Sequence, residues 1–326
     1  MTKNMLSLVM SCALLPSGVH AAQPDAAAAY PARPIRIVVP QSPGASTDLT
    51  ARLIGLKLSE AFGQSVIVDN RPGAGSINGT EVVARAIPDG HTLLVVASSF
   101  TINPSLQKNL PYDTVRDFAP ITQVSRFPNL LAAHPAVPVT TLQDVIALAK
   151  SKPGQLNYAS AGLGTGTHMS AELLKMMTGI DFVHIPFKGG GPAVTAVIGG
   201  QTQLIFGTTV GLLPHVRSGK LKAIAVTTAK RSAAAPEIPT FAESGLPGYD
   251  HGPWNGFFAP GKTPQAIVDK LNAATVRALR SAEVIRIFTN EGADPVGNKP
   301  AEFAVIVKEE TAKWANVIKA AGIKPE

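Results

Sequence analysis

Short apolar runs alternate with helix-length segments along most of this 326-residue chain. The first run, Ile35–Val39, precedes leucines at helical spacing. Two further strand-length runs occupy residues 66–68 and 92–96, with a helical segment at 80–87 between them. Strand–helix–strand repeats of this kind place parallel strands side by side in one sheet. The amino-terminal part of the chain is therefore predicted to form a doubly wound α/β sheet.

The same alternation resumes further along the chain and predicts a second α/β unit. Its expected strands lie at residues 130–133, 156–159, 182–185, 203–206 and 223–226. The apolar run 254–259 is then expected to be a strand that returns to the first unit. Long helices at 264–281 and 301–321 would complete that unit.

The length of the chain also favours two lobes, because a single hydrophobic core usually stops growing at about 250 to 300 residues. We predict that residues 31–125 and 252–326 form lobe 1 and that residues 126–251 form lobe 2, each a mostly parallel sheet flanked by helices. The chain would cross twice between the lobes. Two crossings beside a cleft make a hinge, which suits capture of a ligand by closure.

The first 21 residues have the pattern of a cleaved secretory signal. Lys3 is their only charged residue, an apolar run extends from Met5 to Leu15, and small residues precede a cleavage site near Ala21. The apolar run is too short to span a bilayer. Cys12 is the only cysteine and lies inside this segment, so the exported product would contain no thiol or disulfide. Lipoprotein processing at Cys12 is the alternative.

The charge of the chain indicates affinity for small anions and not for nucleic acid. Without Lys3 the formal net charge is 28 − 22 = +6, and the basic residues are scattered, with only Lys230 and Arg231 adjacent. Aromatic residues make up just 6% of the chain. Neither a phosphate-tracking stripe nor a platform for stacking bases is visible. A general attraction to small anions is compatible with this charge.

Glycine- and hydroxyl-rich turns follow several predicted strands where a helix begins. The turn after the first strand contains Gly44, Ala45, Ser46, Thr47 and Asp48. The first N–H groups of a helix have no intrahelical acceptor and lie at the positive end of the helix dipole. We therefore expect this turn to bind a small carboxylate.

Similar turns occur at other strand ends, where doubly wound folds place their ligands. In the predicted lobe 2 the candidate residues are Ser160, Gly162, Thr165, Thr167 and His168. A plain turn with a capping threonine is the alternative there. The next strand leads to Lys188 and Gly189, and Lys188 could simply be solvated. In lobe 1, Ser98 and Ser99 follow the strand at 92–96.

Patterns typical of cofactors and catalysis are weak. Residues 256–263 match the phosphate-binding P-loop consensus literally, but Phe257, Phe258 and Pro260 fill positions that need flexible backbone. The glycines at 162–166 lack the spacing of a dinucleotide-binding turn. His168, Ser160 and Asp48 could be drawn as a triad, although sequence gives no geometry for one. We predict no enzyme activity, no cofactor and no metal site.

Several motifs together identify a family resemblance. Pro43–Asp48, Asn70–Gly75, Ser160–Gly162, Phe187–Gly189 and the pair Trp254 and Gly256 occur in this order over the whole predicted mature chain. The chain resembles the Bug family, the extracytoplasmic substrate-binding proteins of tripartite tricarboxylate transporters. The resemblance implies a two-lobed Venus-flytrap protein of the periplasm. Such a protein, expected here to be monomeric, holds a small carboxylate between its lobes and delivers it to the membrane permease subunits.

Some positions depart from the family pattern. Ala45 fills a position that is usually glycine, and Phe187 replaces a frequent tyrosine. Many relatives carry an aspartate where this chain has Gly207, Thr208 and Thr209, so the resemblance makes Thr208 a candidate ligand contact. Loss of that acid favours a carboxylate without an amine, since a buried ammonium needs a partner. A ligand sensor for a signalling partner and a periplasmic hydrolase remain as alternatives.

Overall fold

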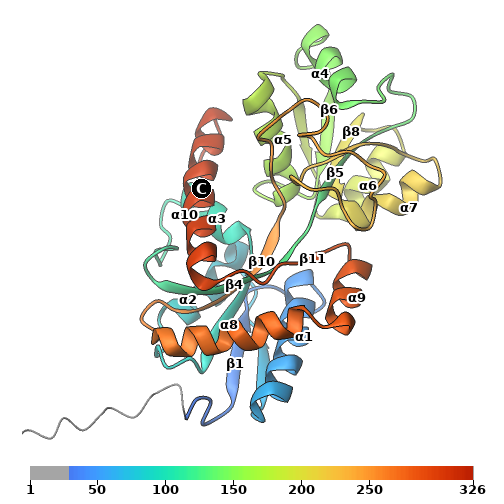
Figure 1. The fold of residues 1–326 in the computed structure, drawn as a ribbon. Helices are drawn as coiled ribbons and strands as arrows, with labels where there is room; N and C mark the ends of the chain where they lie inside the picture. Colours follow the sequence, from blue (N-terminus) through green and yellow to red (C-terminus); the bar gives the residue numbers. More distant parts are fainter. Residues whose placement is uncertain (1–28, 326) are drawn as a thin grey trace, which may run out of the picture.

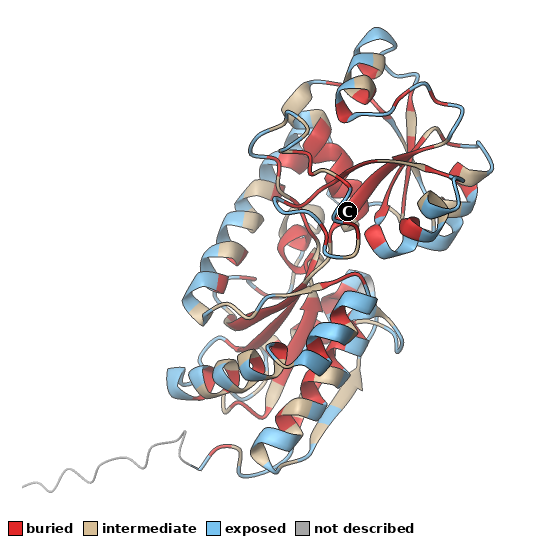
Figure 2. Ribbon diagram, turned by 45° about the vertical axis from the view of Figure 1, so that its right-hand side comes forward, coloured by how far each residue is buried: buried red, intermediate tan, exposed pale blue. Residues whose placement is uncertain are grey.

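The computed structural model describes residues 29–325 and has two α/β lobes (Figure 1). The predicted signal peptide, residues 1–21 with Cys12, lies outside the described residues. The two-lobed α/β fold expected from the sequence is confirmed. Most of the residues in both central sheets are buried (Figure 2).

Lobe 1 contains a six-stranded sheet with the strand order β11-β4-β10-β3-β1-β2. The first three strands along the chain are parallel, as predicted, whereas β10 is antiparallel to both β3 and β4. The short β11 is antiparallel to β4. The strands are β1 (Ile35–Val39), β2 (Val66–Asn70), β3 (Thr92–Ala97), β4 (Phe118–Arg126), β10 (Trp254–Pro260) and β11 (Asp294–Pro295).

Helices cover both faces of this sheet. The side chains of its strands alternate between the two faces, and both faces are apolar. Ile35, Ile37 and Val39 pack with α1 and α8, while Val38 packs on the opposite face with α2, α3 and α10. The helical elements of lobe 1 are α1 (Ser46–Phe62), η1 (Ala74–Ser76), α2 (Ile77–Ala84), α3 (Ser99–Leu106), α8 (Gln265–Leu279), α9 (Ala282–Asn290) and α10 (Pro300–Ala320).

Lobe 2 contains a five-stranded sheet with the order β7-β6-β8-β5-β9. β6 is parallel to β7 and β8, whereas β5 is antiparallel to β8 and β9. Its strands are β5 (Asn129–Ala133), β6 (Asn157–Ser160), β7 (Val183–Pro186), β8 (Leu204–Thr208) and β9 (Lys222–Val226), and its helices are α4 (Leu142–Ser151), α5 (Gly166–Thr178), α6 (Gly190–Ile198) and α7 (Thr209–Arg217).

The chain passes between the sheets twice, first from β4 to β5 and then in the segment that leads from β9 to β10 (Figure 1). Helix α10 also joins the lobes. Phe303 and Val307 in its amino-terminal half belong to the core of lobe 1. Trp314 and Ile318 in its carboxy-terminal half belong to the core of lobe 2. The predicted boundaries placed all of α10 in lobe 1, but the helix contributes to both cores. The division of the chain at residues 126 and 252 therefore stays a prediction.

Candidate functional site

A cavity of about 700 Å³ lies between the two lobes. Lobe 1 lines it with residues that follow the carboxyl ends of β1 and β3 and with the adjoining η1 and α3. Lobe 2 lines it with the turn between β6 and α5. Pro253, in the second crossing between the lobes, also lines the cavity. The polar or charged residues among its lining are Gln41, Ser76, Ser98, Ser99, Asn103, Gln107, Thr165 and Lys324. We call this space the cleft cavity.

A second cavity, of about 590 Å³, lies at the edge of lobe 2 where three helices begin. Thr167 lies in the first turn of α5, Gly190 begins α6, and Thr208 caps α7. These helices follow the parallel strands β6, β7 and β8, so their amino-terminal N–H groups gather at one edge of the sheet. Apolar side chains such as Ile205 and Leu212 form the rest of this lobe-2 groove. The turn at residues 161–167 lines both cavities.

The turn after β1 is held by bonds within lobe 1. The Asp48 carboxylate accepts hydrogen bonds from Gly44 N–H at 2.9 Å, Arg52 Nε at 3.0 Å and Asn70 Nδ2 at 3.0 Å. Burial by itself raises the pKa of Asp48, but these hydrogen bonds outweigh burial and leave the pKa below its ordinary value. Asp48 therefore shapes the turn as an ionised side chain.

The neighbouring residues of this turn have different surroundings. Thr47 is buried and its hydroxyl donates a hydrogen bond to Asn255 Oδ1 at 3.0 Å. Gly44 and Ser46 are exposed, and Ala45 is half-buried. None of the residues from Gly44 to Asp48 lines the cleft cavity or the lobe-2 groove.

Replacing Asp48 tests this account of the turn. We expect Asp48→Asn to lower the free energy of unfolding by about 1 to 3 kcal/mol at pH 7, because one amide would face the donors of Gly44 and Arg52. Urea-induced unfolding measures the change. Asp269→Asn, at an exposed position of α8, is the matched control and should change the free energy by less than about 0.5 kcal/mol. Equal effects of the two substitutions would contradict the role given to Asp48.

The turn between β6 and α5 is tightly hydrogen-bonded. Thr165 caps α5 by accepting from His168 N–H and donates to the carbonyl of Gly162 at 2.7 Å. The hydroxyl of Thr167 accepts from Ala161 N–H at 3.0 Å. The capped turn weighed as an alternative is therefore present, and its residues also face the two cavities. Ligand contact by these residues stays a prediction.

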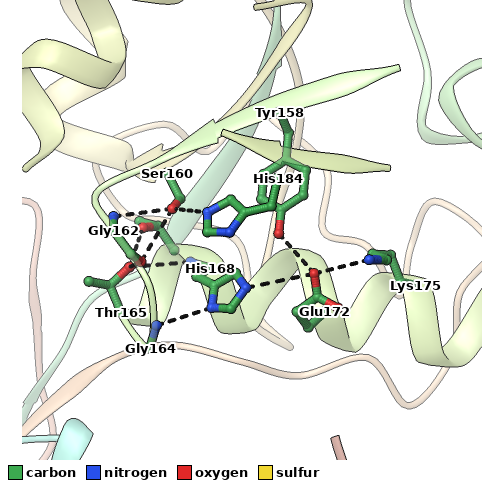
Figure 3. A network of polar contacts seen from close by, with 10 residues as sticks. Tyr158, Ser160, Gly162, Gly164, Thr165, His168, Glu172, Lys175 and His184 are labelled. Atoms are coloured by element: carbon green, nitrogen blue, oxygen red, sulfur yellow. Dashed lines mark hydrogen bonds and ion pairs between the residues drawn. The ribbon is translucent and has the colours of Figure 1, made fainter. Parts of the chain in front are cut away.

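Buried His168 and half-buried His184 lie next to this turn (Figure 3). The rings of His168 and His184 stack with centroids 4.1 Å apart, and Gly164 N–H donates to His168 Nδ1 at 3.1 Å. The Nε2 atom of His168 lies 3.8 Å from the carboxylate of buried Glu172, which accepts from the Tyr158 hydroxyl at 2.9 Å. Burial lowers the pKa of His168 to about 3 and that of His184 to about 4. Both imidazoles are therefore neutral at pH 7.

Ser160 contacts a histidine, although the partner is not the one drawn in the sequence-based triad. Its Oγ lies 2.6 Å from His184 Nε2, while Asp48 belongs to the other lobe. The serine is fully buried, and its Oγ also accepts from Gly162 N–H at 3.1 Å. A nucleophile must reach its substrate, and a base must be ready to accept a proton near neutral pH. The buried serine and the lowered pKa of His184 fit a structural contact.

The remaining predicted contacts are distributed around the cleft. Ser98 is buried and Ser99 half-buried, and both line the cleft cavity. Lys188 is exposed and lines neither cavity, whereas Gly189 N–H donates to the carbonyl of Ala161 at 3.1 Å and so joins two turns of lobe 2. Thr208 lines the lobe-2 groove, where its hydroxyl accepts from Gly211 N–H at 3.3 Å.

Sequence reasoning missed several residues that line the cleft cavity. Ser76 has a left-handed backbone with φ +78°, which is unusual for a residue other than glycine and marks candidate sites. Asn103 holds the adjacent turn by donating to the carbonyl of Gly75 at 3.1 Å. Gln41 directly precedes the first turn and had a sequence signal, namely its place at the end of a strand. Lys324 had none, because its relation to the cleft depends on the end of α10.

Metal-binding clusters and membrane-spanning helices are both absent from residues 29–325. These residues contain no group of three or more His, Cys, Asp or Glu placed to hold a metal ion. No helix in this part of the chain has the length and apolarity to cross a membrane. The segment that matches the P-loop consensus begins as strand β10, whose residues are all buried, which confirms the strand prediction there.

Comparison with known proteins agrees with the fold. Protein BugT of Bordetella pertussis is 36% identical over 323 residues, which cover 98% of this chain and 99% of BugT. A structure of an R. palustris protein with adipate is 36% identical with a TM-score of 0.75, covering 91% of this chain and 100% of that one. MatC from Rhodopseudomonas palustris with bound malate is 36% identical with a TM-score of 0.71, covering 89% and 100%.

A family model also matches most of the chain. The model described as tripartite tricarboxylate transporter family receptor, TctC, matches residues 50–323. This match spans both lobes and includes the whole lining of the lobe-2 groove and that of the cleft cavity except Gln41 and Lys324. Together with the identity to BugT over nearly the whole chain, it shows that this chain belongs to the TctC family of tripartite tricarboxylate transporter receptors, the Bug family.

Proposed function

We propose that this protein captures a small carboxylate in the cleft between its lobes and delivers it to the membrane permease of a tripartite tricarboxylate-type transporter. The observation that carries the proposal is the cleft cavity, because both lobes and the second crossing line it. Helices α3 and α5 begin at this cavity, one from each lobe. Their first N–H groups and the neighbouring hydroxyls suit an anion.

The relatives support the class of ligand. The R. palustris protein with adipate and MatC with malate both hold small carboxylates in folds like this one. Among the residues lining the two cavities, none is aspartate or glutamate. A ligand ammonium would find no carboxylate partner there, which favours carboxylates without an amine. We propose that the protein acts in the periplasm, as a monomer, and that it does not catalyse a reaction.

A thermal-shift screen tests the proposal. The mature protein is unfolded and refolded to remove carried-over ligand, then heated with adipate, malate, succinate, hexanoate, amino acids or sugars. A ligand that binds only the folded state stabilises it by about 2.7 kcal/mol when its concentration is 100 times Kd. We expect a raised Tm with at least one carboxylate and no change with sugars.

Two further results decide between the proposal and its alternatives. Chromatography of the hit after long incubation should recover it unchanged, and its consumption would instead indicate an enzyme. Uptake of the labelled hit by cells should require both this protein and the transporter permease. Binding without any effect on uptake would overturn delivery to the permease and favour a sensor.

A further inference from the structure

The carboxy-terminal tail brings a cation to the cleft cavity. Lys324 lines this cavity together with residues of both lobes. Among the residues that line the cleft cavity or the lobe-2 groove, it is the only lysine, arginine, aspartate or glutamate. No hydrogen bond or ion pair joins Lys324 to another residue in the described range 29–325. Within residues 29–325, Lys324 therefore lines the cavity without a carboxylate partner.

The end of α10 fixes where the tail leaves the helix. Gly322 adopts φ +65° and its N–H donates to the carbonyl of Lys319, while Ile323 N–H donates to the carbonyl of Ile318 at 3.1 Å. This pair of bonds is the Schellman pattern that ends many helices. Ile323 then packs against the core of lobe 2. The residue before Lys324 is thus anchored, and the lysine starts from a defined place beside the cleft.

The neutral residues of the lining and Lys324 suit different parts of a ligand. Helix N-termini and hydroxyl groups can satisfy one carboxylate through neutral donors. A second carboxylate enclosed in the same cleft would need its own partner, because an unpaired charge is costly to desolvate. A lysine ammonium supplies three donors and a full charge.

We infer that Lys324 binds the second carboxylate of a dicarboxylate ligand, so that the cleft prefers dicarboxylates to monocarboxylates. The inference rests on the proposed function and adds to it the class of ligand and one residue that selects it. The lysine is far in sequence from the turns of the cleft, and α10 carries it there from lobe 1 across to lobe 2.

Titration calorimetry of matched acids tests the inference. Adipate and hexanoate have chains of equal length but two and one carboxylates, and succinate and butyrate form a shorter pair. We expect Lys324→Met to weaken binding of the preferred dicarboxylate by about 10- to 100-fold, as for loss of a charge-assisted hydrogen bond. Binding of its monocarboxylate partner should change by less than about threefold. Lys324→Arg should retain most of the preference.

Lys319→Met is the matched control. Lys319 is an exposed lysine in the last turn of α10 that lines neither cavity, so its replacement should leave the dicarboxylate preference unchanged. Circular dichroism should show the same Tm for all three variants. If Lys324→Met weakens both acids of a pair equally, or neither, the inference is wrong while the proposed function stands. If the unchanged protein binds no carboxylate, the proposed function fails as well.

Discussion

The free energy of unfolding is expected to fall steeply between pH 7 and pH 5, by about 2 kcal/mol for each histidine that folding keeps neutral. Three histidines fit this description: His168 and His251, which are buried, and His184, which is half-buried. Burial lowers the pKa of His168 to about 3 and that of His184 to about 4, and it lowers the pKa of His251 well below its ordinary value. A combined loss of about 6 kcal/mol would be comparable to the whole stability of many domains.

The direction of this pH dependence follows from the pH at which the folded and the unfolded protein each take up protons. In the unfolded chain each histidine is protonated as the pH falls through about 6.5. In the folded protein the imidazoles stay neutral until the pH approaches the lowered pKa values of His168 and His184. Unfolding therefore binds protons in this range, and stability is full above about pH 6.5 and is lost as the pH falls. Nearby Lys175 and Lys313 add to the cost of protonating these rings.

Urea-induced unfolding at pH 7, 6 and 5, at constant ionic strength, measures this loss. The slope against pH gives the number of protons bound on unfolding, which should exceed one near pH 5. His184→Gln should reduce that number by about one. A flat free energy between pH 7 and pH 5 would show that these histidines do not titrate as stated.

Carboxylate affinity should be far less sensitive to pH than stability. His168 and His184 remain neutral in the folded protein between pH 7 and pH 5, so the turn between β6 and α5 keeps the same hydrogen bonds. Both carboxyl groups of a small dicarboxylate are mainly ionised above about pH 6, because the first negative charge raises the pKa of the second group by only a limited amount. Calorimetry at pH 7 and pH 6 separates the two effects. The histidine network thus supports the site without acting as its switch.

The sequence predicted the elements whose signals are local. β1 and β3 are continuous apolar runs, and the helices that follow strands begin at capping residues, so both could be located from residue spacing. Strand β4 and helix α3 were not predicted. Pro120 interrupts the apolar run of β4, and Pro104 lies inside α3, so neither showed a clear period.

The candidate site was predictable only in part, for a related reason. Turns that precede helices carry their own signature of glycine and hydroxyl residues, and this placed Ser99, Thr165 and Thr208 at the cavities. Whether a hydroxyl is free for a ligand depends on distant partners, as the bond from Thr47 to Asn255 shows. Lys324 likewise reaches the cleft only through the path of α10. Such contacts follow from packing, which a single sequence does not display.

Helix α10 also determines how the two lobes unfold. Trp314 is fully buried in the core of lobe 2, where its ring meets His251 edge to face at 4.6 Å. One turn earlier, Glu310 accepts a hydrogen bond at 2.8 Å from Nε1 of Trp254, which belongs to the core of lobe 1. The helix thus contains Trp314, in the core of lobe 2, and contacts Trp254, in the core of lobe 1. We expect the lobes to unfold together because α10 is common to them.

Trp314→Ala should lower the free energy of unfolding by about 3 to 5 kcal/mol, since it removes a large side chain from a packed core and leaves a cavity. The remaining Trp254 then reports on lobe 1 by its fluorescence, while circular dichroism follows the whole protein. If α10 couples the lobes, both signals should shift to the same lower urea concentration. Trp314→Phe keeps an aromatic ring in place and gives a reference in which Trp254 is also the only tryptophan.

The control variant for this prediction lies on the same helix. Val305 is 53% exposed on α10, so Val305→Ala should change the free energy of unfolding by less than about 0.5 kcal/mol. The prediction would be contradicted if Trp314→Ala lowered the urea midpoint seen by circular dichroism but left the midpoint of Trp254 fluorescence the same as in Trp314→Phe. Lobe 2 would then unfold alone, and α10 would act as a side attachment to lobe 1. A common shift would instead mean that hinge motion must occur with α10 packed against both cores, which limits how far the cleft can open.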